Sequence, residues 1–99
     1  VVVRPTIVGA SWAEPIRGWT DSINAVGAVM LFGSLGVLRE IYGKPWVTPD
    51  IVPVDFVANA MLAGTAAVLG QRGRFEIVHS QCFSPRFTWE HLRLWSRRY

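Results

Sequence analysis

The chain has 99 residues, of which 51% are hydrophobic and 17% are charged. These proportions allow one domain, or part of one, with a sizeable core, and they exclude a wholly disordered chain. The net charge is +3, but the basic residues form no dense run and match no recognition motif, so we expect no nucleic-acid partner. A single cysteine, Cys82, excludes an internal disulfide and a cysteine cluster for zinc. We expect no metal site.

The first residues, VVVRPTIV, predict a strand over 1–8. Such a β-branched run is typical of a parallel strand that is covered on both faces. Pro5 cannot donate to a β-ladder, so it belongs near the end of the strand. Gly9, Ala10 and Ser11 then allow a tight turn. Since loops that leave the carboxyl ends of parallel strands build ligand sites, we expect a functional loop here.

Residues 12–48 predict a substrate loop and helical region. Pro15 and Gly18 break any helix at its start, and two tryptophans argue against disorder. Residues 25–38 are apolar but too few to cross a bilayer, which needs about 20. They predict a buried helix or a wall of an apolar pocket, and a patch that contacts a membrane or an acyl chain is the alternative. Residues 39–48 read as a polar connector.

A helix is predicted over 54–69. Pro53 suits its first turn, Asp55 is favoured by the helix dipole, and Gly70 is a good residue just past its end. A strand over 74–80 follows.

A loop that contains Pro85 follows. Residues 88–99 are expected to form the beginning of a last helix, with Thr88 as its N-cap. Strand, helix and strand in this order predict a parallel sheet. The predicted fold class is α/β, the C-terminal part of a Rossmann-like doubly wound parallel sheet that is incomplete within 1–99.

Three weak constellations have simpler explanations. Residues 9–13, GASWA, nearly match the nucleophile elbow G-x-S-x-G, but Ala13 replaces the last glycine and a loop continues. His79 and His91 have no second ligand at metal spacing, so we expect structural or surface roles. Capping and turn roles explain Asp50 and Asp55 better than a catalytic pair does.

Catalytic residues are missing from the chain itself. No G-x-G-x-x-G motif is present to cradle a pyrophosphate. The single lysine, Lys44, lies two residues after Tyr42, so there is no Tyr-x-x-x-Lys pair of the kind that donates a proton in short-chain dehydrogenases. We therefore expect no catalysis by these residues alone.

Two blocks resemble the alcohol-forming fatty acyl-CoA reductases of the extended short-chain dehydrogenase/reductase superfamily. The first block, R-P-[ST]-I-V-G-A-S-W-x-E-P and then G-W-x-D, is matched within residues 4–21. The second block, D-[IL]-[IV]-P-V-D, is matched by residues 50–55. The chain departs from the family at Ile16-Arg17 and at residues 25–27, which leaves the preferred acyl chain length open.

The resemblance implies reduction of a long-chain acyl-CoA by NADPH, through an aldehyde, to a primary alcohol. It implies that the glycine fingerprint and the Tyr/Lys pair precede Val1. It places cofactor contacts at Pro5, Thr6, Ile7 and Val8. It places substrate contacts at Ser11, Trp12, Trp19, Met30, Leu31 and Phe32. A membrane association, at the peroxisome or endoplasmic reticulum, is implied by the resemblance only.

Two other classes of function stay open. One is another extended reductase, such as a thioester reductase domain or a sugar-nucleotide epimerase, although the apolar residues 25–38 weigh against a sugar. The other is a non-catalytic module that binds an anionic membrane through residues 25–38 and the C-terminal Trp/Arg helix. As part of a parallel sheet, the chain alone is expected to be marginally stable.

Overall fold

The structure is a computed structural model that describes residues 1–23, 25–81 and 87–97. Cys82, Pro85 and the last two residues of the predicted C-terminal helix lie outside the described residues. The elements, in chain order, are β1 (Val2–Pro5), β2 (Ile7–Gly9), α1 (Ala25–Ser34), β3 (Ile51–Pro53), α2 (Val54–Val68), β4 (Ile77–Ser80) and α3 (Trp89–Ser96). The chain is therefore mixed α/β, and its described strands form two small parallel sheets.

The strand predicted over 1–8 is divided in two, which corrects the sequence analysis. β1 pairs in parallel with β4, whereas β2 pairs in parallel with β3. The change of partner takes place at Thr6, whose N–H donates to the carbonyl of Ser80 at 3.0 Å, while the N–H of Ile7 donates to the carbonyl of Asp50 at 3.1 Å. Pro5, which lacks an N–H, stands directly before this change of partner.

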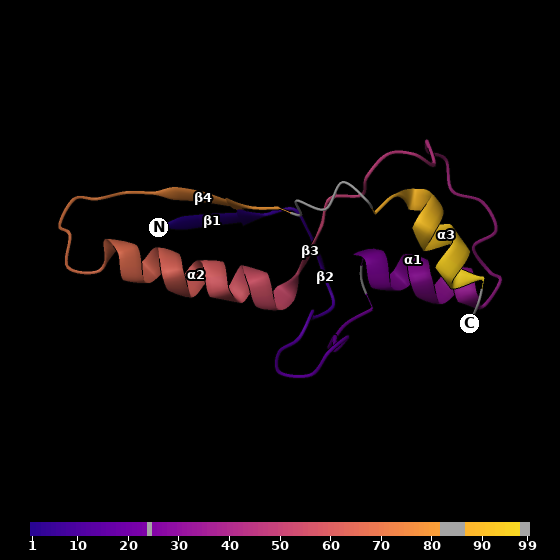
Figure 1. Ribbon diagram of the computed structural model, residues 1–99, viewed down its shortest axis with the longest axis horizontal. Coiled ribbons are helices and arrows are strands. Elements are labelled where there is room, and N and C mark those ends of the chain that lie inside the picture. The colour runs from indigo at the N-terminus through magenta and orange to yellow at the C-terminus, as the bar shows by residue number, and fades with distance from the viewer. Residues whose placement is uncertain (24, 82–86, 98–99) are drawn as a thin grey trace.

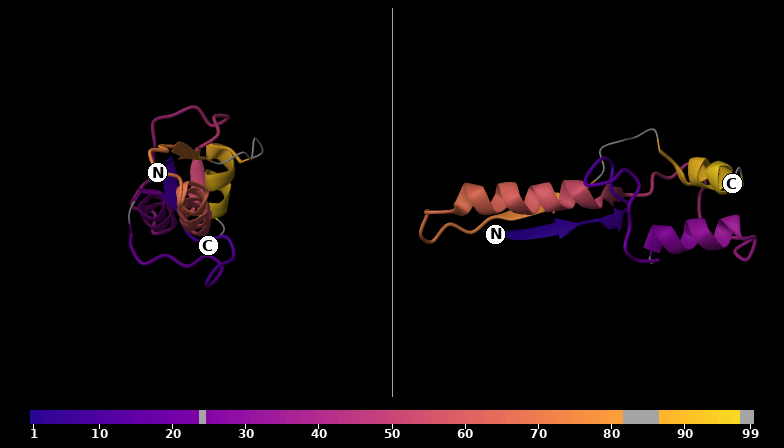
Figure 2. Two further views of the ribbon diagram at one scale, coloured as in Figure 1. Left: turned by 90° about the vertical axis from the view of Figure 1, so that its left-hand side faces the viewer. Right: turned by 90° about the horizontal axis from the view of Figure 1, so that it is seen from below.

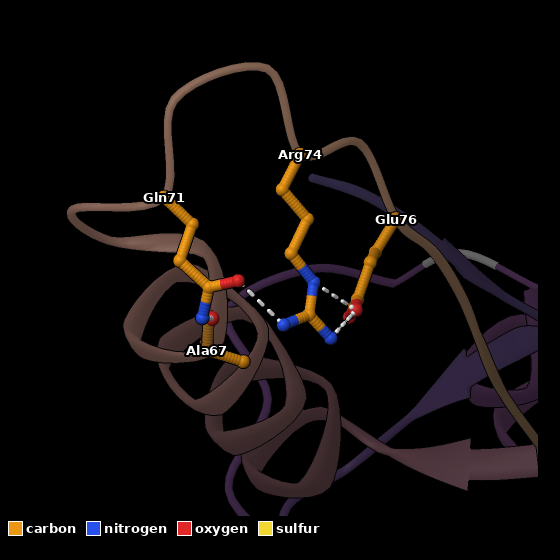
Figure 3. A network of polar contacts seen from close by, with 4 residues as sticks. All are labelled: Ala67, Gln71, Arg74 and Glu76. Atoms are coloured by element: carbon orange, nitrogen blue, oxygen red, sulfur yellow. Dashed lines mark hydrogen bonds and ion pairs between the residues drawn. The ribbon is translucent and has the colours of Figure 1, made fainter.

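The turn between α2 and β4 shortens the strand predicted over 74–80. The N–H of Arg74 donates to the carbonyl of Gln71 at 3.2 Å, so Arg74 belongs to a turn rather than to β4. Its guanidinium group also bonds the side chain of Gln71 at 2.6 Å and forms an ion pair with Glu76 (Figure 3). The Gln71 side chain in turn donates to the carbonyl of Ala67 at 3.0 Å. This exposed network links the end of α2 to the residues that lead into β4.

Helix α2 lies along β1 and β4 at one end of the molecule (Figure 1). It begins directly after β3, with Pro53 as its N-cap, and Gly70 beyond its end has φ +78°. Gly64 is buried, and a Cβ atom added there would lie 3.1 Å from a methyl carbon of Val1. The close approach of α2 to Val1, the residue directly before β1, therefore depends on this glycine.

Helices α1 and α3 pack against each other at the other end, and α1 also contacts β2 (Figures 1 and 2). The N-terminus of α3 is fully capped. Thr88 and His91 form a capping box, and the N–H groups of Trp89 and Glu90 donate to carbonyls of the 45–47 segment at 3.1 and 3.0 Å. The molecule is elongated, with extents of 53 × 27 × 19 Å.

The core is smaller than the composition suggests. Among the described residues, the buried apolar side chains are Val52, Val57 and Leu92. No residue of α1 is buried, so the expectation of a buried helix within 25–38 is wrong; its mostly apolar residues cannot be enclosed by a single sheet edge and α3. None of the helices in the described ranges is long and apolar enough to cross a membrane.

Candidate functional site

The candidate site begins at Thr6, where the two sheets part. The Thr6 hydroxyl donates to a carboxylate oxygen of Asp50 at 3.1 Å and lies 3.5 Å from the carbonyl of Ser80. Ser80 ends β4, and Asp50 immediately precedes β3. Thr6 thus lies at the carboxyl end of one parallel pair and the amino end of the other, and we call this change of strand partner the Thr6 switch point. Ligands of open α/β sheets bind beyond the carboxyl ends of their strands, which makes the end of β1 and β4 a candidate site.

Ser11 closes the loop that leaves β2. Its side chain is buried, its hydroxyl donates to the carbonyl of Ile16, and the same oxygen accepts the N–H of Trp19 at 3.1 Å. The backbones of Ser11 and Trp19 are also hydrogen bonded at 3.0 Å. Since the Ser11 hydroxyl has two protein partners and no helix follows it directly, the arrangement supports a structural role and not a nucleophile elbow.

Asp55, in the first turn of α2, holds the next part of the same loop. Its carboxylate accepts the backbone N–H groups of Trp12 and Ala13 at 2.9 Å each and that of Glu14 at 3.2 Å. These hydrogen bonds, the Trp12 bond foremost, lower the pKa of Asp55 from 3.8 to about 2. The carboxylate therefore fixes the path of the loop that carries both tryptophans.

The sequence predicts a role for Asp55 at the helix dipole and does not indicate its contact with the loop. The three donors are backbone amides that lie 41–43 residues earlier in the chain, and backbone amides leave no signature in a sequence. The only available signal was that the G-A-S-W-x-E-P and D-x-V-P-V-D blocks occur together.

The other predicted contact residues are more accessible than Ser11. Pro5, Ile7 and Val8 are exposed along β1 and β2. Trp12 and Trp19 are 64% and 45% exposed. The structure thus presents an apolar strand edge and a tryptophan-bearing loop on the surface around the Thr6 switch point.

Two of the six predicted substrate residues line a hollow, each a different one, and Ser11 and Trp12 line neither. Trp19 lines an open recess of about 630 Å³ beside Asp55 at the start of α2. Met30 lines a separate cavity of about 280 Å³ between α1, the 38–45 segment and α3. Leu31 and Phe32 are exposed and line neither hollow.

The cavity between α1 and α3 includes residues that sequence reasoning missed. Residues 39–45, part of the polar connector predicted over 39–48, form one side of it together with Leu38, and Leu92 and Ser96 of α3 contribute another. A connector with so few apolar residues gives no periodic signal that would place it against a helix.

Each of the two histidines lies in a regular element of the described part of the chain. The Nδ1 atom of His91 accepts the N–H of Thr88 at 3.1 Å, which completes the cap of α3. His79 stands in β4 opposite Arg4. Across residues 1–23, 25–81 and 87–97, no three His, Cys, Asp or Glu side chains gather in a way that could hold a metal ion.

Comparison with known proteins supports the resemblance seen in the sequence. Residues 1–61 match the model of an NAD-binding family described as male sterility protein. Human fatty acyl-CoA reductase 2 and human fatty acyl-CoA reductase 1 are each 45% identical over 62 residues, and mouse fatty acyl-CoA reductase 2 is 42% identical over 62 residues. Each alignment covers 63% of this chain and 12% of the relative. No solved structure matches.

The matched residues 1–61 contain β1, β2, the loop held by Asp55, α1 and β3. They include both sequence blocks on which the resemblance rests. Because the family model covers more than half of the chain, this chain belongs to the male sterility protein family and is related to the fatty acyl-CoA reductases.

Proposed function

We propose that this chain forms the substrate side of an NADPH-dependent reductase that converts a long-chain acyl-CoA to a primary alcohol. The observation that carries the proposal is the identity of 45% to human fatty acyl-CoA reductases over 62 residues. Residues 1–61, which match the family model, contain both strands at Thr6, the loop held by Asp55 and α1. The chain spans only 12% of the length of these relatives, so the activity concerns the whole protein.

The proposed fold is part of a doubly wound, Rossmann-like sheet. In support, both strand pairs are parallel, and α2 connects β3 to β4 while packing on β1 and β4. A helix between strands that run in the same direction is the unit from which such sheets are built.

The residues around Thr6 fit the nicotinamide end of a dinucleotide better than its phosphates. Pro5, Ile7 and Val8 offer an exposed apolar edge, whereas the three adjacent loop N–H groups that could hold a phosphate are already bound by Asp55. NADPH, when bound, supplies the hydride. We assign Thr6 a positioning role at this edge, because its hydroxyl donates a hydrogen bond to Asp50.

In this proposal Ser11 and Asp55 keep the loop rigid, and Trp12 and Trp19 shield the reacting thioester from water. Met30, Leu31 and Phe32 of α1 present an apolar surface to the alkyl chain. A membrane contact is part of the proposal as well, since Tyr42 and Trp46, in the segment between α1 and β3, are highly exposed aromatic residues.

The test is a reductase assay on the protein expressed from its complete gene. We expect oxidation of NADPH that depends on palmitoyl-CoA and yields hexadecanol, and we expect Met30→Asp to abolish it because a charge would be placed in an apolar wall. Leu69→Asp, at the exposed residue directly after α2, is the matched control and should retain activity. Turnover of a nucleotide sugar in place of palmitoyl-CoA would overturn the proposal.

A further inference from the structure

The cavity between α1 and α3 has an apolar floor and a polar rim. Leu92 is buried, and Val29, Met30 and Leu38 are half-buried. Three charged residues outside α3 also line the cavity, and all three are exposed: Arg39, Glu40 and Lys44. A hollow of about 280 Å³ with this distribution suits an apolar group that enters from a polar surface.

Several polar groups around this cavity are engaged within the protein. Glu90 and Arg93 form an ion pair, and the Nε atom of Arg39 donates to the carbonyl of Gly36 at 3.4 Å. The N–H groups at the start of α3 are bound by carbonyls of the 45–47 segment. The helix terminus therefore cannot serve as a phosphate site, and the chemistry favours an alkyl chain over an anion.

Helix α1 connects this cavity to the Thr6 region. It contacts β2 and also packs on α3. Its ten residues span about 15 Å. An alkyl chain that starts beside β2 and follows α1 reaches the cavity only if it is long.

We propose that the cavity between α1 and α3 holds the methyl end of the acyl chain and sets the longest chain that the protein accepts. This inference rests on the proposed function and adds the site of chain-length selection. Gly33 and Ser96 form the close contact between the two helices: a Cβ atom added at Gly33 would lie 3.5 Å from the Cβ of Ser96. Side-chain volume at this contact therefore controls the depth of the cavity.

The test changes the volume of the cavity in both directions, in the protein expressed from its complete gene. Ser96→Leu adds apolar side-chain volume and so narrows the cavity. Met30→Ala removes side-chain volume and so enlarges the cavity. Arg97→Leu is the matched control, because it places the same side chain at the next position, which does not line the cavity. The measured quantity is the ratio of kcat/KM for stearoyl-CoA to that for lauroyl-CoA.

We expect Ser96→Leu to lower this ratio at least about tenfold, since even single methylene groups in apolar pockets give discrimination of this order. Met30→Ala should raise the ratio, and Arg97→Leu should leave it unchanged. Equal ratios in Ser96→Leu and Arg97→Leu would overturn the inference.

A binding measurement separates this inference from the proposed function. The fluorescent fatty acid parinaric acid, added without NADPH, should bind Ser96→Leu more weakly than Arg97→Leu. If the unmodified protein reduces no acyl-CoA, the proposed function fails, and this difference in affinity would still support an alkyl site in the cavity. Equal affinity in the two variants would overturn the site.

Discussion

At the scale of single residues, Asp55 is the side chain on which the candidate site most depends. Its carboxylate bonds three successive backbone N–H groups of the loop after β2. The sequence predicts a helix-terminal role for Asp55 and a loop after Ser11, but it does not connect them, because backbone donors look the same at every position. The Thr6–Asp50 bond was missed for a related reason, since it joins residues that are 44 positions apart.

Replacing Asp55 with Asn should make the stability of the fold change less with pH in the acid range. The folded pKa of about 2 lies below the unfolded value of 3.8, so the carboxylate stabilises the fold above pH 3.8, and this contribution is lost as the pH falls through about 2. The Tm of the original protein should therefore exceed that of Asp55→Asn at neutral pH, and the two values should converge in strong acid.

The exposed Asp21→Asn variant is the control for a general effect of charge. A difference in Tm between the original protein and Asp55→Asn that persists unchanged in strong acid would contradict the assigned role of the carboxylate.

At the scale of elements, the helices were easier to predict than the strands. The boundaries of α2 follow from local chemistry, because Pro53 suits a helix start and Gly70 a helix end, and the structure has the helix at Val54–Val68. The division of the first strand could not be read from its residues, since both halves are equally β-branched and the change of partner at Thr6 depends on β4 and β3. The sequence also does not predict which elements α1 packs against, because its nearly uniform apolar sequence marks no single buried face.

The packing of α2 on β1 gives a prediction at this scale. Gly64→Leu should lower the free energy of unfolding by about 1–3 kcal/mol, because its Cβ would already lie 3.1 Å from Val1 and the larger side chain overpacks the contact. Ala63→Leu, at the neighbouring exposed position, should change it by less than about 0.5 kcal/mol. Chemical denaturation of both variants makes the comparison, and equal stability would show that α2 does not pack closely on β1.

At the scale of the whole molecule, the two ends differ in character. One end holds α2 against β1 and β4, and the other holds α1 and α3, with β2 and β3 between them (Figure 1). The cavity lies between α1 and α3. The sequence predicts parallel strands and an α/β class. It does not predict two separate sheets, because pairing between distant strands is set by tertiary contacts and not by local pattern. The apolar-pocket alternative for residues 25–38 depends on α3, which lies more than 50 residues later.

Photo-crosslinking tests whether this chain forms the substrate side of an acyl-CoA reductase. Two palmitoyl-CoA analogues, one with a diazirine near the thioester and one with a diazirine near the methyl end, would be irradiated with the protein expressed from its complete gene. Mass spectrometry should find the first label within residues 5–19 and the second within residues 25–45 or 89–96. Labelling that excludes residues 1–99 with both analogues would contradict the claim.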